Sequence, residues 1–140
     1  SNVTDMSFII SGAGKFNGDL GNWDVSNVVN MEGMLQSTHS SNQNISSWDV
    51  SKVINMKSLF AYSTFIKDIS SWDVGSVTDM SNMFKNSDFN QDLNTWDVSE
   101  VTNMLGMFMD ADVFNGNISA WDVGKVEEMN SMFRRAYKFN

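Results

Sequence analysis

Apolar and polar residues alternate along this chain in a pattern that returns every 24 or 25 residues. The tryptophans mark it, with spacings of 25, 24, 24 and 25 residues between Trp23, Trp48, Trp72, Trp96 and Trp121. Counting each Trp as position 0, Leu or Ile stands at −3, Val at +2 and +5, Met at +8, and a pair of large apolar residues at +11 and +12. A fixed period of this length is typical of stacked repeats, because one repeat cannot bury its apolar face alone.

Two spacings within each repeat predict two elements. From −3 to +2 the residues read L-x-x-W-x-V, the spacing of a leucine-rich-repeat strand, which predicts a short parallel strand such as 69–74 in the third repeat. From +5 to +12 the apolar residues recur every third position, which predicts a short helix or 3₁₀ turn such as 77–84. Ser or Gly at +3 suits the start of that helix. We therefore expect an α/β solenoid, a right-handed, leucine-rich-repeat-like coil with one short parallel strand and one short helix or 3₁₀ turn per repeat.

Length and composition restrict the function classes. Residues 1–140 are expected to form a single repeat domain of about five and a half repeats, excised from a longer array. The net charge of −8 argues against nucleic acid and against anionic membrane surfaces as partners. No apolar run is long enough for direct membrane insertion. The chain has no Cys, which excludes disulfides, thiol nucleophiles and zinc-thiolate sites.

The repeated motif resembles a known family. W-D-V-S-x-V-x-N-M-x-x-M-F, followed by F-N-x-D-I-S, resembles the BspA-type leucine-rich repeat of bacterial surface proteins. It is closer still to the related mycoplasma-lipoprotein repeat, a domain of unknown function. The resemblance covers the whole chain, although Ser or Gly stands where the family often has Pro after the strand. It implies an extracellular protein on the cell surface that serves in adhesion or host contact.

One acidic column recurs at +1 of every repeat. It consists of Asp24, Asp49, Asp73, Asp97 and Asp122. In strands stacked about 4.8 Å apart, neighbouring carboxylates would repel each other. We expect each to accept the backbone N–H two residues on, in an Asx turn. The alternative is a calcium ladder, with the ion shared between coils by oxygen ligands.

Asparagine-rich columns at −6, −4 and +7 are expected to hydrogen-bond along the stack. The −6 column reads Asn17, Asn42, Ile66, Asn90, Asn115 and Asn140. Like the +1 column, these positions are interpreted as scaffold because they hardly change from repeat to repeat.

Residues that vary between repeats are better candidates for binding. Position +13 varies freely, and the corner after the predicted helix forms a possible interaction surface of Tyr62, Met109, Arg134, Arg135 and Tyr137. Enzymatic chemistry has little support, because the chain has a single His (His39) and carboxylates that keep to their columns. We expect no cofactor and no catalytic residue.

The leading functional hypothesis is therefore a non-enzymatic cell-surface module for adhesion or for protein or glycan binding. Its partner would be a protein or glycan of the host or of a neighbouring cell. The alternative is a structural, self-assembling solenoid that stacks end to end into a fibre or surface layer, because the terminal repeats show no capping unit. A glycoside hydrolase using Asp pairs is a third and weaker hypothesis.

Overall fold

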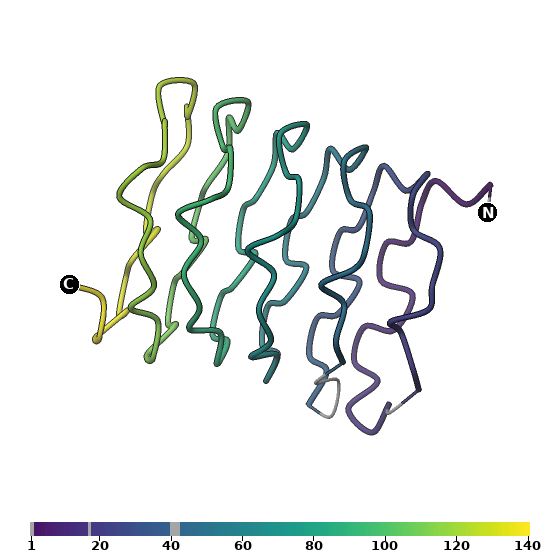
Figure 1. Cartoon of the computed structure of the whole chain (residues 1–140). Coiled ribbons are helices and arrows are strands. Elements are labelled where there is room, and N and C mark those ends of the chain that lie inside the picture. Colours follow the sequence, from purple (N-terminus) through teal and green to yellow (C-terminus); the bar gives the residue numbers. More distant parts are fainter. Residues whose placement is uncertain (1, 17, 40–42) are drawn as a thin grey trace.

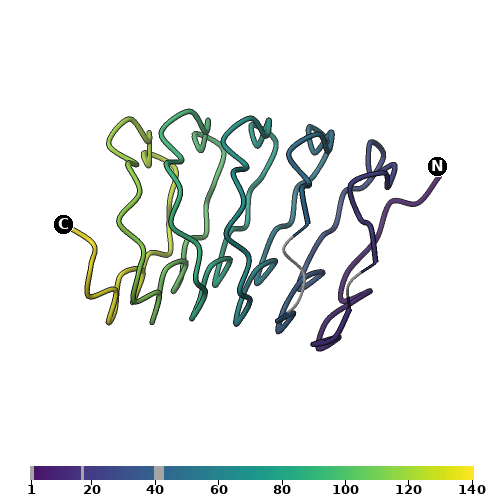
Figure 2. The same ribbon diagram turned by 60° about the horizontal axis from the view of Figure 1, so that its bottom comes forward.

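The repeats stack side by side as successive coils of one chain. The computed structural model describes residues 2–16, 18–39 and 43–140. Figures 1 and 2 show the coils following one another along a single axis, with the two termini at opposite ends of the stack. We number coils 1 to 5 by their tryptophans Trp23, Trp48, Trp72, Trp96 and Trp121, and residues 2–16 precede coil 1.

The predicted α/β solenoid of the leucine-rich-repeat kind is wrong. Within the described residues the chain forms no helix and no extended strand. Single parallel bridges join the +7 residues of neighbouring coils: Asp5 with Asn30, Asn30 with Asn55, Asn55 with Asp79, Asp79 with Asn103, and Asn103 with Glu128. The rest of each coil is a series of turns. In coil 3, the predicted strand 69–74 contains the turn closed by Trp72 N–H and the Ile69 carbonyl, 3.1 Å apart.

Left-handed backbone conformations explain why the predicted helix does not form. Positions +10 and +14 have positive φ in every coil: Phe8, Gly12, Gly33, Ser37, Ser58, Tyr62, Asn82, Asn86, Gly106, Asp110, Ser131 and Arg135. A right-handed helix cannot continue through such a residue. The three-residue spacing instead comes from linked four-residue turns, such as the one closed by Met83 N–H and the Met80 carbonyl at 3.2 Å. The positive φ of Asn82 at the third position of this turn is typical of type II.

A ladder of backbone hydrogen bonds joins each coil to the next along this segment. The N–H groups at +8, +10, +12 and +14 donate to the carbonyls at +7, +9, +11 and +13 of the following coil. Between coils 2 and 3 the donors are Met56, Ser58, Phe60 and Tyr62, with N–O distances of 2.7 to 2.9 Å. The ladder therefore lies on the segment that was expected to be helical.

The segment expected to be a strand is linked to its neighbour mainly by the tryptophans. The indole N–H of each Trp in coils 2 to 5 donates to the −3 carbonyl of the preceding coil. The pairs are Trp48 with Leu20, Trp72 with Ile45, Trp96 with Ile69, and Trp121 with Leu93, at 2.8 to 3.0 Å. The predicted core position of Trp is confirmed, since Trp72 and Trp96 are each only 3% exposed.

Columns of aromatic rings fill the interior. The +12 rings of Phe60, Phe84, Phe108 and Phe133 follow one another at centroid distances of 5.4 to 5.7 Å and are nearly parallel. Stacked aromatic pairs contribute about 0.5–1.5 kcal/mol each beyond the burial of their area. Met at +8 and Met or Leu at +11 complete the core in coils 1 to 4, as their spacing predicts.

The asparagine columns are structural, as expected. In the −6 column, Asn90 Oδ1 accepts from Asn115 N–H at 2.7 Å, and Asn115 Oδ1 accepts from Asn140 N–H at 3.0 Å. Asn17 and Asn42 of that column lie outside the described residues. No helix in the described part of the chain has the length and apolarity needed to cross a membrane.

Candidate functional site

The +1 aspartates all form Asx turns. Oδ1 of Asp24, Asp49, Asp73, Asp97 and Asp122 accepts the backbone N–H two residues on, at 3.0 to 3.2 Å. The Asx-turn prediction is therefore confirmed. Position +3 is Ser or Gly because it holds this donor, and it does not begin a helix.

Hydrogen bonding lowers the pKa of several of these carboxyls. The Ser51 hydroxyl, 2.6 Å from Asp49 Oδ1, and the Ser51 N–H hold the pKa of Asp49 below its usual value. The Ser99 side chain and N–H lower the pKa of Asp97 in the same way. The charged form is favoured because both donors bind the carboxylate.

A cation site needs several ligands close together. No group of three His, Asp or Glu side chains that could hold a metal ion occurs in the described part of the chain. The +1 carboxylates are each used by their own turn. Calcium binding by this column therefore stays a hypothesis that only a direct measurement can support.

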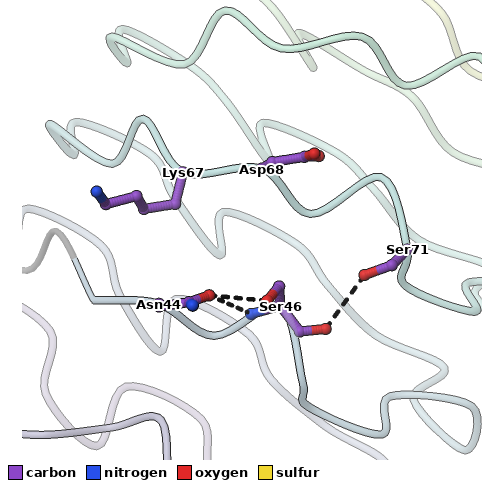
Figure 3. A pocket seen from close by; sticks show the side chains of 5 residues that line it. All are labelled: Asn44, Ser46, Lys67, Asp68 and Ser71. Carbon is purple, nitrogen blue, oxygen red and sulfur yellow. Dashed lines mark hydrogen bonds between the residues drawn. The ribbon is translucent and has the colours of Figure 1, made fainter.

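A shallow polar groove lies beside the −4 column. Its lining residues are Asn44, Ser46, Lys67, Asp68 and Ser71, around a volume of about 330 Å³ (Figure 3). Most of their polar atoms already link the protein to itself. Asn44 Oδ1 accepts from the Ser46 N–H and hydroxyl, and the Ser71 hydroxyl donates to the Ser46 carbonyl at 3.2 Å. We call this the seam groove, because its side chains hold neighbouring coils together.

A second groove follows the corner at +14 and +16. Tyr62, Asn86, Asp110, Asp112, Arg135 and Tyr137 line it, around a volume of about 460 Å³. We call it the corner groove. It crosses four consecutive coils, because Tyr62 belongs to coil 2, Asn86 to coil 3, the two aspartates to coil 4, and Arg135 and Tyr137 to coil 5.

The backbone of the corner groove is constant while its side chains vary. The four +14 residues Tyr62, Asn86, Asp110 and Arg135 all have φ between 48° and 58°. The N–H groups of Tyr62, Asn86 and Asp110 each donate to the next coil's +13 carbonyl at 2.7 to 2.8 Å. Each coil therefore presents a different side chain from the same backbone position.

Polar groups in the corner groove remain available. Arg135 Nη1 lies 3.4 Å from Asp110 Oδ1, and Lys85 Nζ lies 5.6 Å from the centroid of the Tyr62 ring. The side-chain amide of Asn86, the Asp112 carboxylate and both tyrosine hydroxyls make no hydrogen bond within residues 2–16, 18–39 and 43–140. Tyr137 is 75% exposed and Tyr62 is 38% exposed. This contrasts with the seam groove, where the polar atoms are already used.

The predicted interaction surface coincides with the groove in part. Tyr62, Arg135 and Tyr137 line it, whereas Met109 and Arg134, both at +13, do not. Sequence reasoning missed Asn86, Asp110 and Asp112. The variation at +14 is as wide as at +13 and could have revealed two of them, but the left-handed backbone that exposes the +14 side chain was not foreseen.

Comparison with known proteins identifies the repeat. A family model described as "Mycoplasma protein of unknown function, DUF285" matches residues 1–87 and, in a second match, residues 61–140. The chain belongs to this family. No curated protein and no solved structure matches it.

The two overlapping DUF285 matches agree with a chain built from one repeated unit. They confirm the resemblance to the mycoplasma repeat domain. They carry no activity and do not address the BspA-type or leucine-rich-repeat half of that resemblance. Function must therefore be argued from the corner groove.

Proposed function

We propose that this chain is a non-enzymatic binding module of the cell surface, and that it contacts a protein or glycan through the corner groove. The observation that carries the proposal is the constant backbone of the groove with its variable side chains. A scaffold column keeps one residue type because one hydrogen bond must be made in every coil, as at +1. A column that keeps its conformation and changes its chemistry suits recognition.

The residue types in the groove fit this role. Tyr and Arg are enriched among residues that dominate binding energies, because they combine large contact area with polar groups. Tyr62, Arg135 and Tyr137 supply three such residues on one face. Both tyrosines are exposed without a structural hydrogen bond to explain their hydroxyls.

The extracellular location is part of the proposal. The BspA-type resemblance of the repeated W-D-V-S-x-V-x-N-M motif supports a surface position, since that repeat type is found in bacterial surface proteins. The net charge of −8 disfavours nucleic acid as the alternative macromolecular partner.

The test is adhesion of beads coated with the full chain to cultured epithelial cells. A triple variant carries Tyr62→Asn, Arg135→Asn and Tyr137→Thr. Asn tolerates the left-handed conformation and already stands at +14 as Asn86, and Thr already stands at +16 as Thr64. The matched control is Lys67→Ala, in the seam groove. We expect the triple variant to lose adhesion and the control to keep it. Adhesion that is absent for the unaltered chain, or equal for all three, would refute the proposal.

A further inference from the structure

We propose that the corner groove binds an uncharged glycan, laid across coils 2 to 5. This inference deepens the proposed function and rests on it. It follows from the way in which the groove can and cannot make contacts, considered in turn for the backbone, the side chains and the charges.

The backbone of the groove has little to offer an extended peptide. A peptide that adds to a sheet edge needs unpaired N–H and C=O groups along that edge. Here the N–H groups of Tyr62, Asn86 and Asp110 already donate to the carbonyls of Lys85, Met109 and Arg134. Recognition in the groove must therefore come from side chains.

Those side chains provide no apolar pocket. Every lining residue is aromatic with a hydroxyl, an amide or charged, and none is aliphatic. Protein partners are usually anchored by a side chain that fills a buried, desolvated pocket. A groove without such a pocket favours a ligand that is itself polar over its whole surface.

The same side chains match the chemistry of a sugar. A pyranose has a face of C–H bonds that packs against an aromatic ring, and hydroxyls around its rim that donate and accept. Tyr137, 75% exposed, offers a ring surface, and Tyr62 offers a second, held by Lys85. Asn86 and Asp112, whose polar atoms have no partner in the described part of the chain, can bind adjacent hydroxyls.

The charges of the groove disfavour an anionic ligand. Arg135, the one cation among the lining residues, is already within 3.4 Å of Asp110. Asp112 then remains as an uncompensated carboxylate on a chain of net charge −8. A sulfate or uronate placed here would be repelled. Sugar hydroxyls instead donate well to a carboxylate.

The length of the groove suits an oligosaccharide. Tyr62 and Tyr137 belong to coils three steps apart, which corresponds to about 14 Å when coils repeat at the spacing of paired strands. A single monosaccharide cannot reach both rings. Affinity is therefore expected to rise from monosaccharide to oligosaccharide until both rings are covered.

The experiment titrates the full chain with defined oligosaccharides by calorimetry, after a screen on a glycan array. The probes are uncharged hexose and N-acetylhexosamine oligomers, with uronate-containing and sulfated oligomers of equal length for comparison. We expect uncharged probes to bind better than anionic ones. Tyr137→Thr should weaken binding about tenfold, the upper end of one aromatic contact. Lys67→Ala should leave it unchanged.

The remaining outcomes separate this inference from the proposed function. Tighter binding of the anionic probes, or binding that Tyr137→Thr leaves unchanged, overturns the glycan inference. So does bead adhesion that depends on the groove but persists after enzymatic deglycosylation of the cells, which leaves the proposed function standing with a protein partner. Loss of both glycan binding and groove-dependent adhesion overturns the two together.

Discussion

The indole N–H of Trp72 donates a hydrogen bond of 3.0 Å to the main-chain carbonyl of Ile45, one coil earlier. Its ring lies 6.3 Å from that of Trp48 and 6.0 Å from that of Phe60. One side chain thus joins two coils and fills the core between them.

Replacing this side chain should destabilise the stack severely. We expect Trp72→Ala to cost about 3–5 kcal/mol, because it leaves a large cavity and removes the partner of a buried carbonyl. Trp72→Phe should cost less, since it keeps a ring and loses the hydrogen bond. Ser76→Ala, at an exposed position of the same coil, is the control. Urea unfolding measures all three, and a Trp72→Ala variant as stable as the control would contradict the role assigned to the indole.

The Asx turn at Asp73 gives a separate prediction on calcium. Asp73→Ala should lower the unfolding free energy by about 1 kcal/mol, because the Gly75 N–H loses its acceptor. Removing calcium with a chelator should leave the melting temperature unchanged. A rise of several degrees on adding millimolar calcium, lost in Asp73→Asn, would instead establish the calcium ladder by mass action.

The lowered pKa values predict a loss of stability in acid. The pKa values of Asp49 and Asp97 are lower in the folded chain because the Ser51 and Ser99 groups bind their carboxylates. The stabilisation is fully present above the unfolded pKa, near 4, and is lost as the pH falls from there through the lower folded pKa. Unfolding free energies measured across this range should fall less steeply in an Asp49→Asn, Asp97→Asn double variant. An equally steep fall would mean that other carboxyls dominate the acid response.

Repeat columns and buried positions could be predicted from the sequence, but the local backbone could not. The spacing of apolar residues shows which side chains point inward, and Trp72, Val77 and Met80 are all buried as expected. It does not show how the chain passes between them. Both a 3₁₀ turn and two linked type II turns place every third residue on one side, and Gly33, Asn82 and Gly106 at +10 were the overlooked sign of the second. The corner groove was only partly foreseen for the same reason, since its +14 side chains depend on that left-handed backbone.

The left-handed positions can be tested directly at Ser58, which has φ of +55°. Gly occupies the same column in coils 1 and 4, so Ser58→Gly should raise the unfolding free energy by about 0.5 kcal/mol. It removes a steric penalty of about 1–2 kcal/mol and adds part of that back as unfolded-state entropy. Ser58→Val should destabilise, because a β-branched residue is poorly tolerated there. Ser76→Gly, at a position without positive φ, should destabilise by entropy alone. A loss of stability in Ser58→Gly equal to that in Ser76→Gly would argue against the linked turns.

Position +15 offers a matched pair of buried serines. Ser63 Oγ accepts the Phe65 N–H at 3.1 Å and lies 3.4 Å from Thr38 Oγ1. Ser87 Oγ is equally buried and has no hydrogen-bond partner within the described residues. An unsatisfied buried hydroxyl costs about 1–3 kcal/mol, and the column already accepts alanine, as Ala111 shows. We therefore expect Ser87→Ala to raise the unfolding free energy by about 1 kcal/mol and Ser63→Ala to lower it by a similar amount. Thermal and urea unfolding of the two single variants and of the double variant would measure this, and the two effects should nearly cancel. A Ser87→Ala variant that loses stability would show that its hydroxyl makes a hydrogen bond in solution.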